Sequence, residues 1–271
     1  MKRAKQLLLT ILTASCLYPA AAGAQGINPD SKKPLEITAQ ESLEWNRTEK
    51  FFKARKTVIA KQGETTLKAD TLTAKYRDEK GGGMKIYRIE ADGHVIIESA
   101  ASKAYGDHAV YTVDDGLAVL KGKNLRLTAP DQTVTARDRI EYRVANGKLD
   151  AIGNAVAMRE GDKLEADRIS AIFTKDSKGK RTLKQLDAKN NVKITTPTEV
   201  LTGDNGTYQA DTSLAEIIGN VKITRGPNIL EGEKAQLDLK TNISKMFGSA
   251  DGNGRVRGVF YPGSETPPAT E

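Results

Sequence analysis

The fold is best predicted from a repeated pattern, of which one copy reads Leu164-Glu165-Ala166-Asp167-Arg168-Ile169-Ser170-Ala171. It combines an apolar residue, a small residue and an acid with two further apolar residues that stand two positions apart. Copies of the pattern begin at Leu67, Ala104, Leu201 and Leu230. A unit that repeats in this way cannot bury its own apolar face and must stack on its neighbours. The pattern therefore predicts one elongated molecule rather than a globule with a single centre.

A second motif carries a Gly, Asn or His joint followed by alternating apolar residues. Copies are Gly93-His94-Val95-Ile96-Ile97, Gly153-Asn154-Ala155-Val156-Ala157-Met158, Asn190-Asn191-Val192-Lys193-Ile194 and Gly219-Asn220-Val221-Lys222-Ile223. The apolar residues alternate with period two, which is typical of strands with one buried face. With one landmark residue taken in each copy, the strands recur every 29 to 37 residues.

The acid of the first motif marks a change of phase. Apolar residues fall on odd positions before Asp70 and on even positions after it. One extra residue turns the inner face of a strand outward unless the backbone bends or bulges there. We therefore predict structural corners at Asp70, Asp107, Asp167, Asp204 and Glu233. Residues 39–43 and 136–140 carry one residue more, so we expect corners of a different geometry there.

Bent strands repeated about seven times predict an all-β fold. Two packed sheets or a flattened, V-shaped jelly roll would satisfy the pattern. A parallel β-helix is the competing architecture, although its turns usually need fewer residues. We favour the jelly roll.

The first 24 residues read as a cleaved signal peptide with a basic start, a short apolar stretch and the site Ala22-Gly23-Ala24. Lipidation at Cys16, the only cysteine, is the weaker alternative. We expect a polar leader over residues 25–34, the β-jelly roll over residues 35–261 and a disordered tail over residues 262–271.

The composition supports neither catalysis nor nucleic-acid binding. The two histidines, His94 and His108, lie in different repeats without acidic partners at metal-ligand spacing. No basic run with interleaved aromatic residues is present. We therefore predict no metal, no cofactor, no nucleic-acid partner and no enzymatic activity.

Together these features resemble the OstA-like family. The most specific stretches are residues 219–226, 230–233 and 254–260. The resemblance implies an all-β fold, an elongated, twisted, V-shaped antiparallel β-jelly roll. It also implies a periplasmic protein that binds lipopolysaccharide and carries it through a hydrophobic interior from the inner to the outer membrane. It also implies end-to-end assembly of copies, with inner-membrane and outer-membrane transport components at opposite ends.

The inward side of the valine-type strands is the candidate lipid lining, although the same residues could simply form the core. These residues are Val58, Val95, Ile97, Leu125, Leu127, Val156, Met158, Val192, Ile194, Val221 and Ile223. A structural β-solenoid and a polysaccharide-active β-helix enzyme with paired carboxylates are the alternatives to a lipid conduit.

Overall fold

The computed structural model describes residues 33–175, 181–241, 243–249 and 254–262. Within them the chain forms one sheet of 18 strands and no helix. The predicted signal peptide, most of the leader and nearly all of the tail lie outside the described residues. The strands are β1 (Glu36–Thr38), β2 (Ser42–Asn46), β3 (Phe51–Gln62), β4 (Thr65–Asp78), β5 (Met84–Glu98), β6 (Lys103–Thr112), β7 (Leu117–Lys121), β8 (Leu125–Ala129), β9 (Gln132–Ala136), β10 (Arg139–Arg143), β11 (Lys148–Arg159), β12 (Asp162–Lys175), β13 (Arg181–Thr195), β14 (Val200–Gln209), β15 (Leu214–Arg225), β16 (Asn228–Asp238), β17 (Ile243–Phe247) and β18 (Arg257–Val259).

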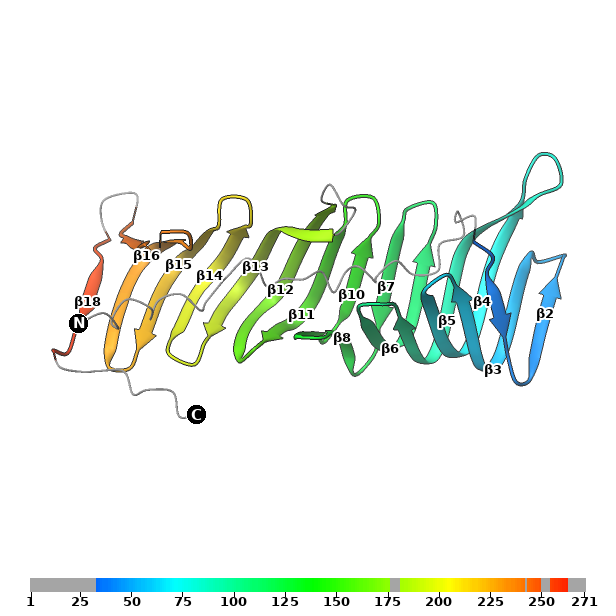
Figure 1. Cartoon of the computed structure of the whole chain (residues 1–271), viewed down its shortest axis with the longest axis horizontal. Coiled ribbons are helices and arrows are strands. Elements are labelled where there is room, and N and C mark those ends of the chain that lie inside the picture. Colours follow the sequence, from blue (N-terminus) through cyan, green and yellow to red (C-terminus); the bar gives the residue numbers. More distant parts are fainter. Residues whose placement is uncertain (1–32, 176–180, 242, 250–253, 263–271) are drawn as a thin grey trace.

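The strands lie side by side across the long axis of the molecule, from β2 at one end to β18 at the other (Figure 1). The pairings between successive long strands are antiparallel, as between β4 and β5 or β14 and β15. This arrangement confirms the all-β antiparallel prediction and excludes the parallel β-helix. The count of about seven repeats stays a prediction.

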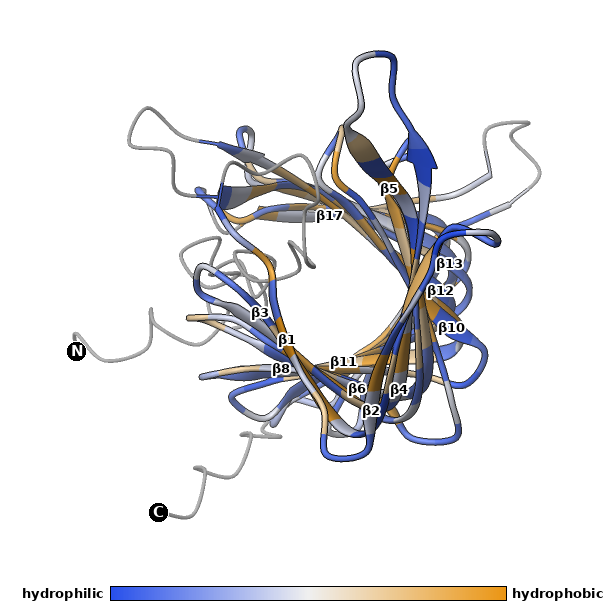
Figure 2. Cartoon of the chain, turned by 90° about the vertical axis from the view of Figure 1, so that its right-hand side faces the viewer, coloured by the Kyte–Doolittle hydropathy of each residue, from blue (hydrophilic) through white to orange (hydrophobic). Residues whose placement is uncertain are grey.

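Each long strand bends near its middle, so that the sheet folds into two arms. Viewed along the long axis, the strands curve around a common axis (Figure 2). Apolar side chains of both arms form one core cluster that includes Val58, Leu72, Val95, Leu125 and Ile169. The two inner faces bury each other, which neither could do alone.

The bend coincides with the phase change predicted from the sequence. On the valine-type strand two consecutive residues have positive φ, for example Gly93 and His94 or Gly219 and Asn220. They lie opposite a single acid, Asp107 for the first pair and Glu233 for the second. Two residues against one form a β-bulge, which turns the strand and restores an inward apolar face on both arms.

The acid of one strand also lies against the bulge of the next. Asp70 accepts a hydrogen bond from His94, with 2.8 Å between Oδ2 and Nδ1, and Asp204 accepts from Nδ2 of Asn220 at 3.1 Å. A Cβ at Gly93 would lie 2.1 Å from Oδ2 of Asp70. Positive φ and this close approach together explain why glycine stands here.

The two corners predicted to differ are interrupted strands. Residues 39–41 separate β1 from β2, and residues 137–138 separate β9 from β10. The backbone amides of Arg137 and Asp138 donate to the carbonyls of Gly153 and Ile152 across the break. The added residue therefore breaks the strand while its two halves keep the same neighbour, β11.

The small residue before each acid gives room to the facing arm. At Gly203 in β14 a Cβ would lie 2.4 Å from Cγ2 of Ile217, whereas at Gly206, three residues later, the nearest atom would be 3.6 Å away. Neither glycine has a positive φ. The crowding at Gly203 is thus a matter of packing between side chains and not of backbone conformation.

Replacing each of these glycines by alanine is expected to have opposite effects. Gly203→Ala should lower the free energy of unfolding by about 1–3 kcal/mol, because Ile217 must move away. Gly206→Ala should be neutral or stabilise by up to about 1 kcal/mol, because glycine is unfavourable inside a strand. Urea unfolding of both variants measures the difference, and equal effects would contradict this account of the corner.

Candidate functional site

Two apolar cavities lie between the inner faces of the arms. The larger, which we call the C-terminal cavity, has a volume of about 200 Å³ and is lined by residues of β8, β9 and β11 to β16. The smaller, the N-terminal cavity, has a volume of about 70 Å³ and is lined by residues of β4 to β8, β10 and β11 together with Ser102. Protein interiors rarely leave voids larger than a water molecule. Two such spaces in one apolar groove therefore indicate room for a ligand.

Small residues on the inner faces create this space. Alanines 104, 109 and 118 border the N-terminal cavity. Alanines 151, 157, 171, 188 and 215 and Gly206 border the C-terminal one. At these inward positions a small residue stands in place of a large apolar one. The side chains of the facing arm do not fill the space that this leaves.

Charged residues form one mouth of the C-terminal cavity. The hairpin between β11 and β12 contributes Arg159, Glu160, Asp162 and Lys163 to its lining. Nε of Arg159 lies 3.2 Å from Oδ2 of Asp131. Burial raises the pKa of Asp162, and the negative charge of Glu160 raises it further. The positive charge of Arg159 acts in the opposite direction but does not outweigh these two effects. The cavity thus has an apolar interior and a charged rim.

A buried arginine stands at the edge of the core beyond this cavity. Arg181 is 8% exposed and its guanidinium donates a hydrogen bond to the hydroxyl of Tyr142. The same guanidinium lies 5.4 Å from the centre of the Tyr142 ring. Burial raises the pKa of Tyr142, while the charge of Arg181 acts in the opposite direction. No pattern in the sequence predicted this pair.

Apart from Ile223, the predicted lining residues divide into three groups. Leu127, Val192 and Ile194 line the C-terminal cavity, and Ile97 and Leu127 line the N-terminal one. A second group is fully buried without bordering either cavity, and it comprises Val58, Val95, Leu125 and Val221. Ile223 is half-buried and packs against the core.

Val156 and Met158 form the third group, and the structure differs from the prediction at Val156. Ala155 is 0% exposed and Ala157 packs against the core, so the alternation in β11 turns Val156 outward. Met158 is 52% exposed, but it is also among the residues that line the C-terminal cavity. The residue after the left-handed pair Gly153-Asn154 is Ala155, and it occupies the position that Val221 takes after Gly219-Asn220. The prediction aligns this copy of the motif by Val156 and not by the pair Gly153-Asn154. The predicted inward face is therefore shifted by one residue.

The lining of the second arm was missing from the prediction. Leu149, Ile169, Phe173, Tyr208 and Ile217 line the C-terminal cavity opposite the valine-type halves. Two of them occupy apolar positions that follow the acid in the first motif, as Ile169 follows Asp167 and Tyr208 follows Asp204. The first motif therefore indicated the second wall as well. Because the inward positions change from odd to even at the acid, both halves of the strand present apolar side chains to the same interior.

The corner acids lie along the bend and accept hydrogen bonds from nearby residues. Asp107 accepts a hydrogen bond from the backbone amide of Lys123 at 2.8 Å, and Asp167 accepts from Nδ2 of Asn191 at 3.2 Å. Among the described residues, no group of three His, Cys, Asp or Glu side chains could hold a metal ion. The arrangement indicates binding of an apolar ligand rather than acid–base chemistry.

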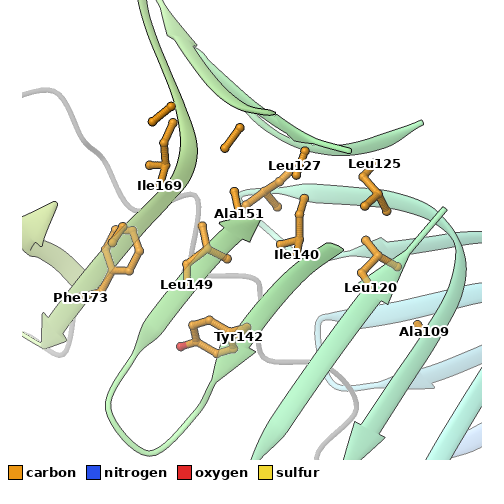
Figure 3. Close-up of a cluster of buried hydrophobic side chains, with 14 of the residues drawn as sticks. Ala109, Leu120, Leu125, Leu127, Ile140, Tyr142, Leu149, Ala151, Ile169 and Phe173 are labelled. Carbon is orange, nitrogen blue, oxygen red and sulfur yellow. The ribbon is translucent and has the colours of Figure 1, made fainter. Parts of the chain in front are cut away.

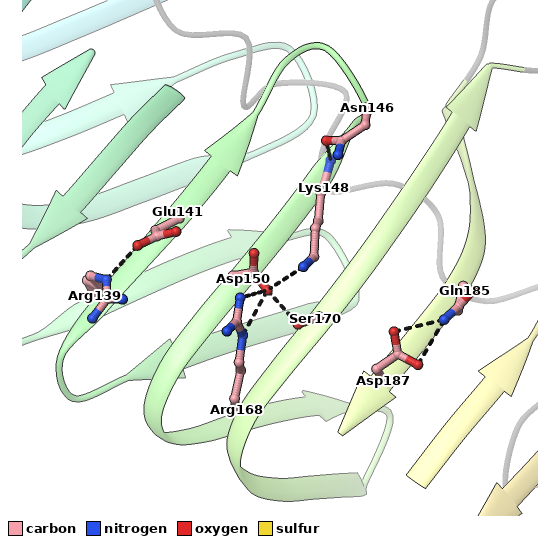
Figure 4. Close-up of polar contacts among 9 residues, drawn as sticks. All are labelled: Arg139, Glu141, Asn146, Lys148, Asp150, Arg168, Ser170, Gln185 and Asp187. Carbon is pink, nitrogen blue, oxygen red and sulfur yellow. Dashed lines mark hydrogen bonds and ion pairs between the residues drawn. The ribbon is translucent and has the colours of Figure 1, made fainter. Parts of the chain in front are cut away.

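A polar network on the outer face of the second arm holds the central strands together (Figure 4). Asp150 faces away from the cavity and is nevertheless 2% exposed. Its Oδ1 accepts hydrogen bonds from Ser170 and from Nε of Arg168 at 3.0 Å, and Nζ of Lys148 lies 3.4 Å away. Burial opposes ionisation of this carboxyl, but the hydrogen bonds from Ser170 and Arg168 and the two cations outweigh it and lower the pKa of Asp150.

Both ends of the sheet have unpaired edges among the described residues. β1 and β2 pair only with β3, and β17 and β18 pair only with β16. Leu43 and Trp45 at one end are 59% and 46% exposed, and Ile243 and Phe260 at the other are 52% and 66% exposed. Apolar surface next to free backbone donors and acceptors is typical of edges that receive a partner strand.

The fold and the groove together define a class, the elongated antiparallel β-jelly roll with an apolar interior. The family model described as LptA/(LptD N-terminal domain) LPS transport protein matches residues 36–148 and again residues 138–243. The chain therefore belongs to this family of lipopolysaccharide-transport proteins. In the described residues we find no helix with the length and apolarity needed to cross a membrane.

Two individual proteins are similar to the chain. An uncharacterized protein of Rhizobium meliloti (strain 1021) is 27% identical over 155 residues, which are 55% of this chain and 82% of that protein. The crystal structure of LptH from Pseudomonas aeruginosa, described as the LptA homologous periplasmic component of the lipopolysaccharide transport device, is 14% identical. The alignment covers 86% of this chain and 99% of the LptH chain, with a TM-score of 0.22.

The double match reflects two related units within one chain. Equivalent residues stand 97 positions apart, as in Asp70 and Asp167, Val95 and Val192, and Asp107 and Asp204. The two interrupted corners, at residues 39–41 and 137–138, also correspond. Both units belong to one continuous sheet, in which β7 pairs with β10 and β8 with β9.

We expect Asp150→Asn to lower the free energy of unfolding at neutral pH by about 1–3 kcal/mol, through lost charge-assisted hydrogen bonds. Because the folded-state pKa of Asp150 is lowered, its contribution exists above the unfolded pKa of about 3.9 and disappears as the pH falls through the folded value. Stability measured by urea unfolding should therefore depend less on pH in the acid range in the variant. Asp115→Asn, in an exposed turn, is the control, and identical pH profiles for Asp150→Asn and the native chain would refute this role.

Proposed function

We propose that this protein binds lipopolysaccharide by its acyl chains in the inner groove and carries it across the periplasm from the inner to the outer membrane. The observation that supports the proposal most is the pair of apolar cavities enclosed between the two arms of a chain of this family. Each acyl CH₂ group moved out of water gains about 0.8 kcal/mol. A lipid with several acyl chains therefore needs an apolar path to cross an aqueous compartment.

The groove suits a ligand with one apolar and one polar part. Its interior is lined by aliphatic and aromatic residues, and charged groups such as Arg159 and Lys163 stand at its mouth. Acyl chains would lie inside and the polar part of the lipid would remain at the rim. No step of bond making or breaking is required, and the role that we propose is transport without catalysis or cofactor.

End-to-end assembly completes the proposal. The edges at β1 and β2 and at β17 and β18 can each extend the sheet by pairing with a strand of a partner. The junction between the two units of this chain, where β7 and β8 pair with β10 and β9, offers a model for such a joint. The partners would be further copies of the chain and the membrane components of lipopolysaccharide transport. A signal peptide over residues 1–24 would deliver the chain to the periplasm.

A carboxylate placed on the inner face tests the groove. Ile194 lines the C-terminal cavity, and Lys189 of the same strand is exposed at the corner. Ile194→Asp should weaken lipopolysaccharide binding at least about tenfold, because a charge in an apolar lining repels acyl chains or must take up a proton at a cost. Lys189→Asp should leave binding unchanged.

Binding of purified lipopolysaccharide is measured by fluorescence titration, and circular dichroism checks that both variants fold. A folded Ile194→Asp protein with native affinity would place the lipid elsewhere. If the native chain binds no lipopolysaccharide but still associates with itself, the structural β-solenoid replaces the transport proposal.

Leu43 tests the end-to-end contact. Its side chain belongs to the edge strand β2 and is 59% exposed. Leu43→Asp should reduce self-association measured by light scattering at rising protein concentration, because the joint would bury a charge. Glu41→Gln, in the neighbouring break between β1 and β2, is the control. Unchanged association of the Leu43 variant would exclude this edge from the contact.

A further inference from the structure

Two leucines border both cavities at once. Leu127 from β8 and Leu149 from β11 are the two residues shared by the linings of the N-terminal and C-terminal cavities. They come from opposite arms and are 4% and 7% exposed. The two side chains therefore stand between the cavities as a common wall.

Buried apolar residues surround the wall, among them Leu125, Ile140 and Ala151 (Figure 3). Ile140 also borders the N-terminal cavity, and Ala151 borders the C-terminal one. The two linings contain small residues as well, with Ala104 and Ala118 in the N-terminal cavity and Ala157 and Ala171 in the other. The two linings therefore share Leu127 and Leu149 and are otherwise separate.

The wall lies where the two family units meet. The family matches overlap at residues 138–148, and Leu149 follows directly. The N-terminal cavity takes most of its lining from the first match and the C-terminal cavity takes most of its lining from the second.

We propose that Leu127 and Leu149 divide the groove into two acyl-chain compartments, one for each unit of the chain. This inference rests on the proposed function, whose site it subdivides. A dry apolar cavity of about 150 Å³ suffices to bind a ligand such as benzene. The C-terminal cavity exceeds this volume and takes the larger part of an acyl chain, whereas the N-terminal cavity takes a chain end.

The wall consists of side chains, and core side chains change rotamer even in a close-packed interior. An acyl chain therefore passes from one compartment to the other when the leucines move, without any opening of the sheet. The protein therefore has two successive binding sites for an acyl chain, separated by a barrier, rather than one continuous groove.

The experiment blocks one compartment and reads the other. Cys16, the only cysteine of the sequence, is replaced by serine, and Ile194→Cys is coupled to a dodecyl chain through a disulfide so that the C-terminal cavity is filled. A fatty acid with a terminal diazirine is then photocrosslinked to the full chain. Mass spectrometry of peptides from β5 and β6 reads the N-terminal cavity, and peptides from β12 to β14 read the C-terminal one.

With the wall intact, the tethered chain should abolish labelling of β12 to β14 and leave labelling of β5 and β6 unchanged. In the Leu149→Ala background, and independently in the Leu127→Ala background, the tethered chain should reduce labelling of both regions. Leu164→Ala, which enlarges the C-terminal cavity alone, should behave like the native wall. Leu149→Phe keeps the wall without creating a cavity and should also preserve independent labelling, which guards against variants that merely fold poorly.

Loss of labelling in β5 and β6 with the native wall in place would show one continuous groove and overturn the inference. Equal results in the wall variants and in Leu164→Ala would overturn it as well. Purified lipopolysaccharide is titrated in parallel on the unmodified chain. If it does not bind while the fatty acid labels two independent compartments, the proposed transport function fails and the division of the groove stands.

Discussion

The structure depends on the burial of two apolar faces of the same strands against each other. A strand has a side-chain period of two, so a simple bend would turn one half of each strand outward. Two left-handed residues opposite one acid, as at Gly219-Asn220 and Glu233, insert the extra residue that corrects the phase. Each strand can then contribute to both walls of one interior, and repetition of the corner builds an elongated molecule.

The same corner explains which residues can stand at the bend. Glycine and asparagine accept the left-handed backbone, and the neighbouring carboxylate packs over the glycine and accepts a hydrogen bond from the residue beside it. Small residues such as Gly203 allow the facing arm to approach. The hydrogen bonds of these acids are thus used to fix the bend.

Function follows from where packing is left incomplete. Alanines and Gly206 on the inner faces leave two cavities, while Leu127 and Leu149 close the space between them. The proposed transport of lipopolysaccharide would use these spaces for the acyl chains, and the proposed end-to-end assembly would use the apolar edges at Leu43 and Phe260. The proposals on transport, assembly and compartments all use the space and edges that one bent sheet leaves free.

Patterns within single strands predict the strand period, the all-β class and the positions of the bends, because these depend on neighbouring residues in one strand. Antiparallel pairing is implied only by the family resemblance, since the repeat alone leaves a parallel β-helix open. The same patterns pick out Val192 and Ile194, which line the C-terminal cavity. The packing of the two arms determines that Ala155 rather than Val156 faces inward, that Phe173 and Tyr208 form the opposite wall, and that Leu127 and Leu149 border both cavities. These features depend on the register between strands and on how the two arms pack against each other, and residues distant in the chain set both.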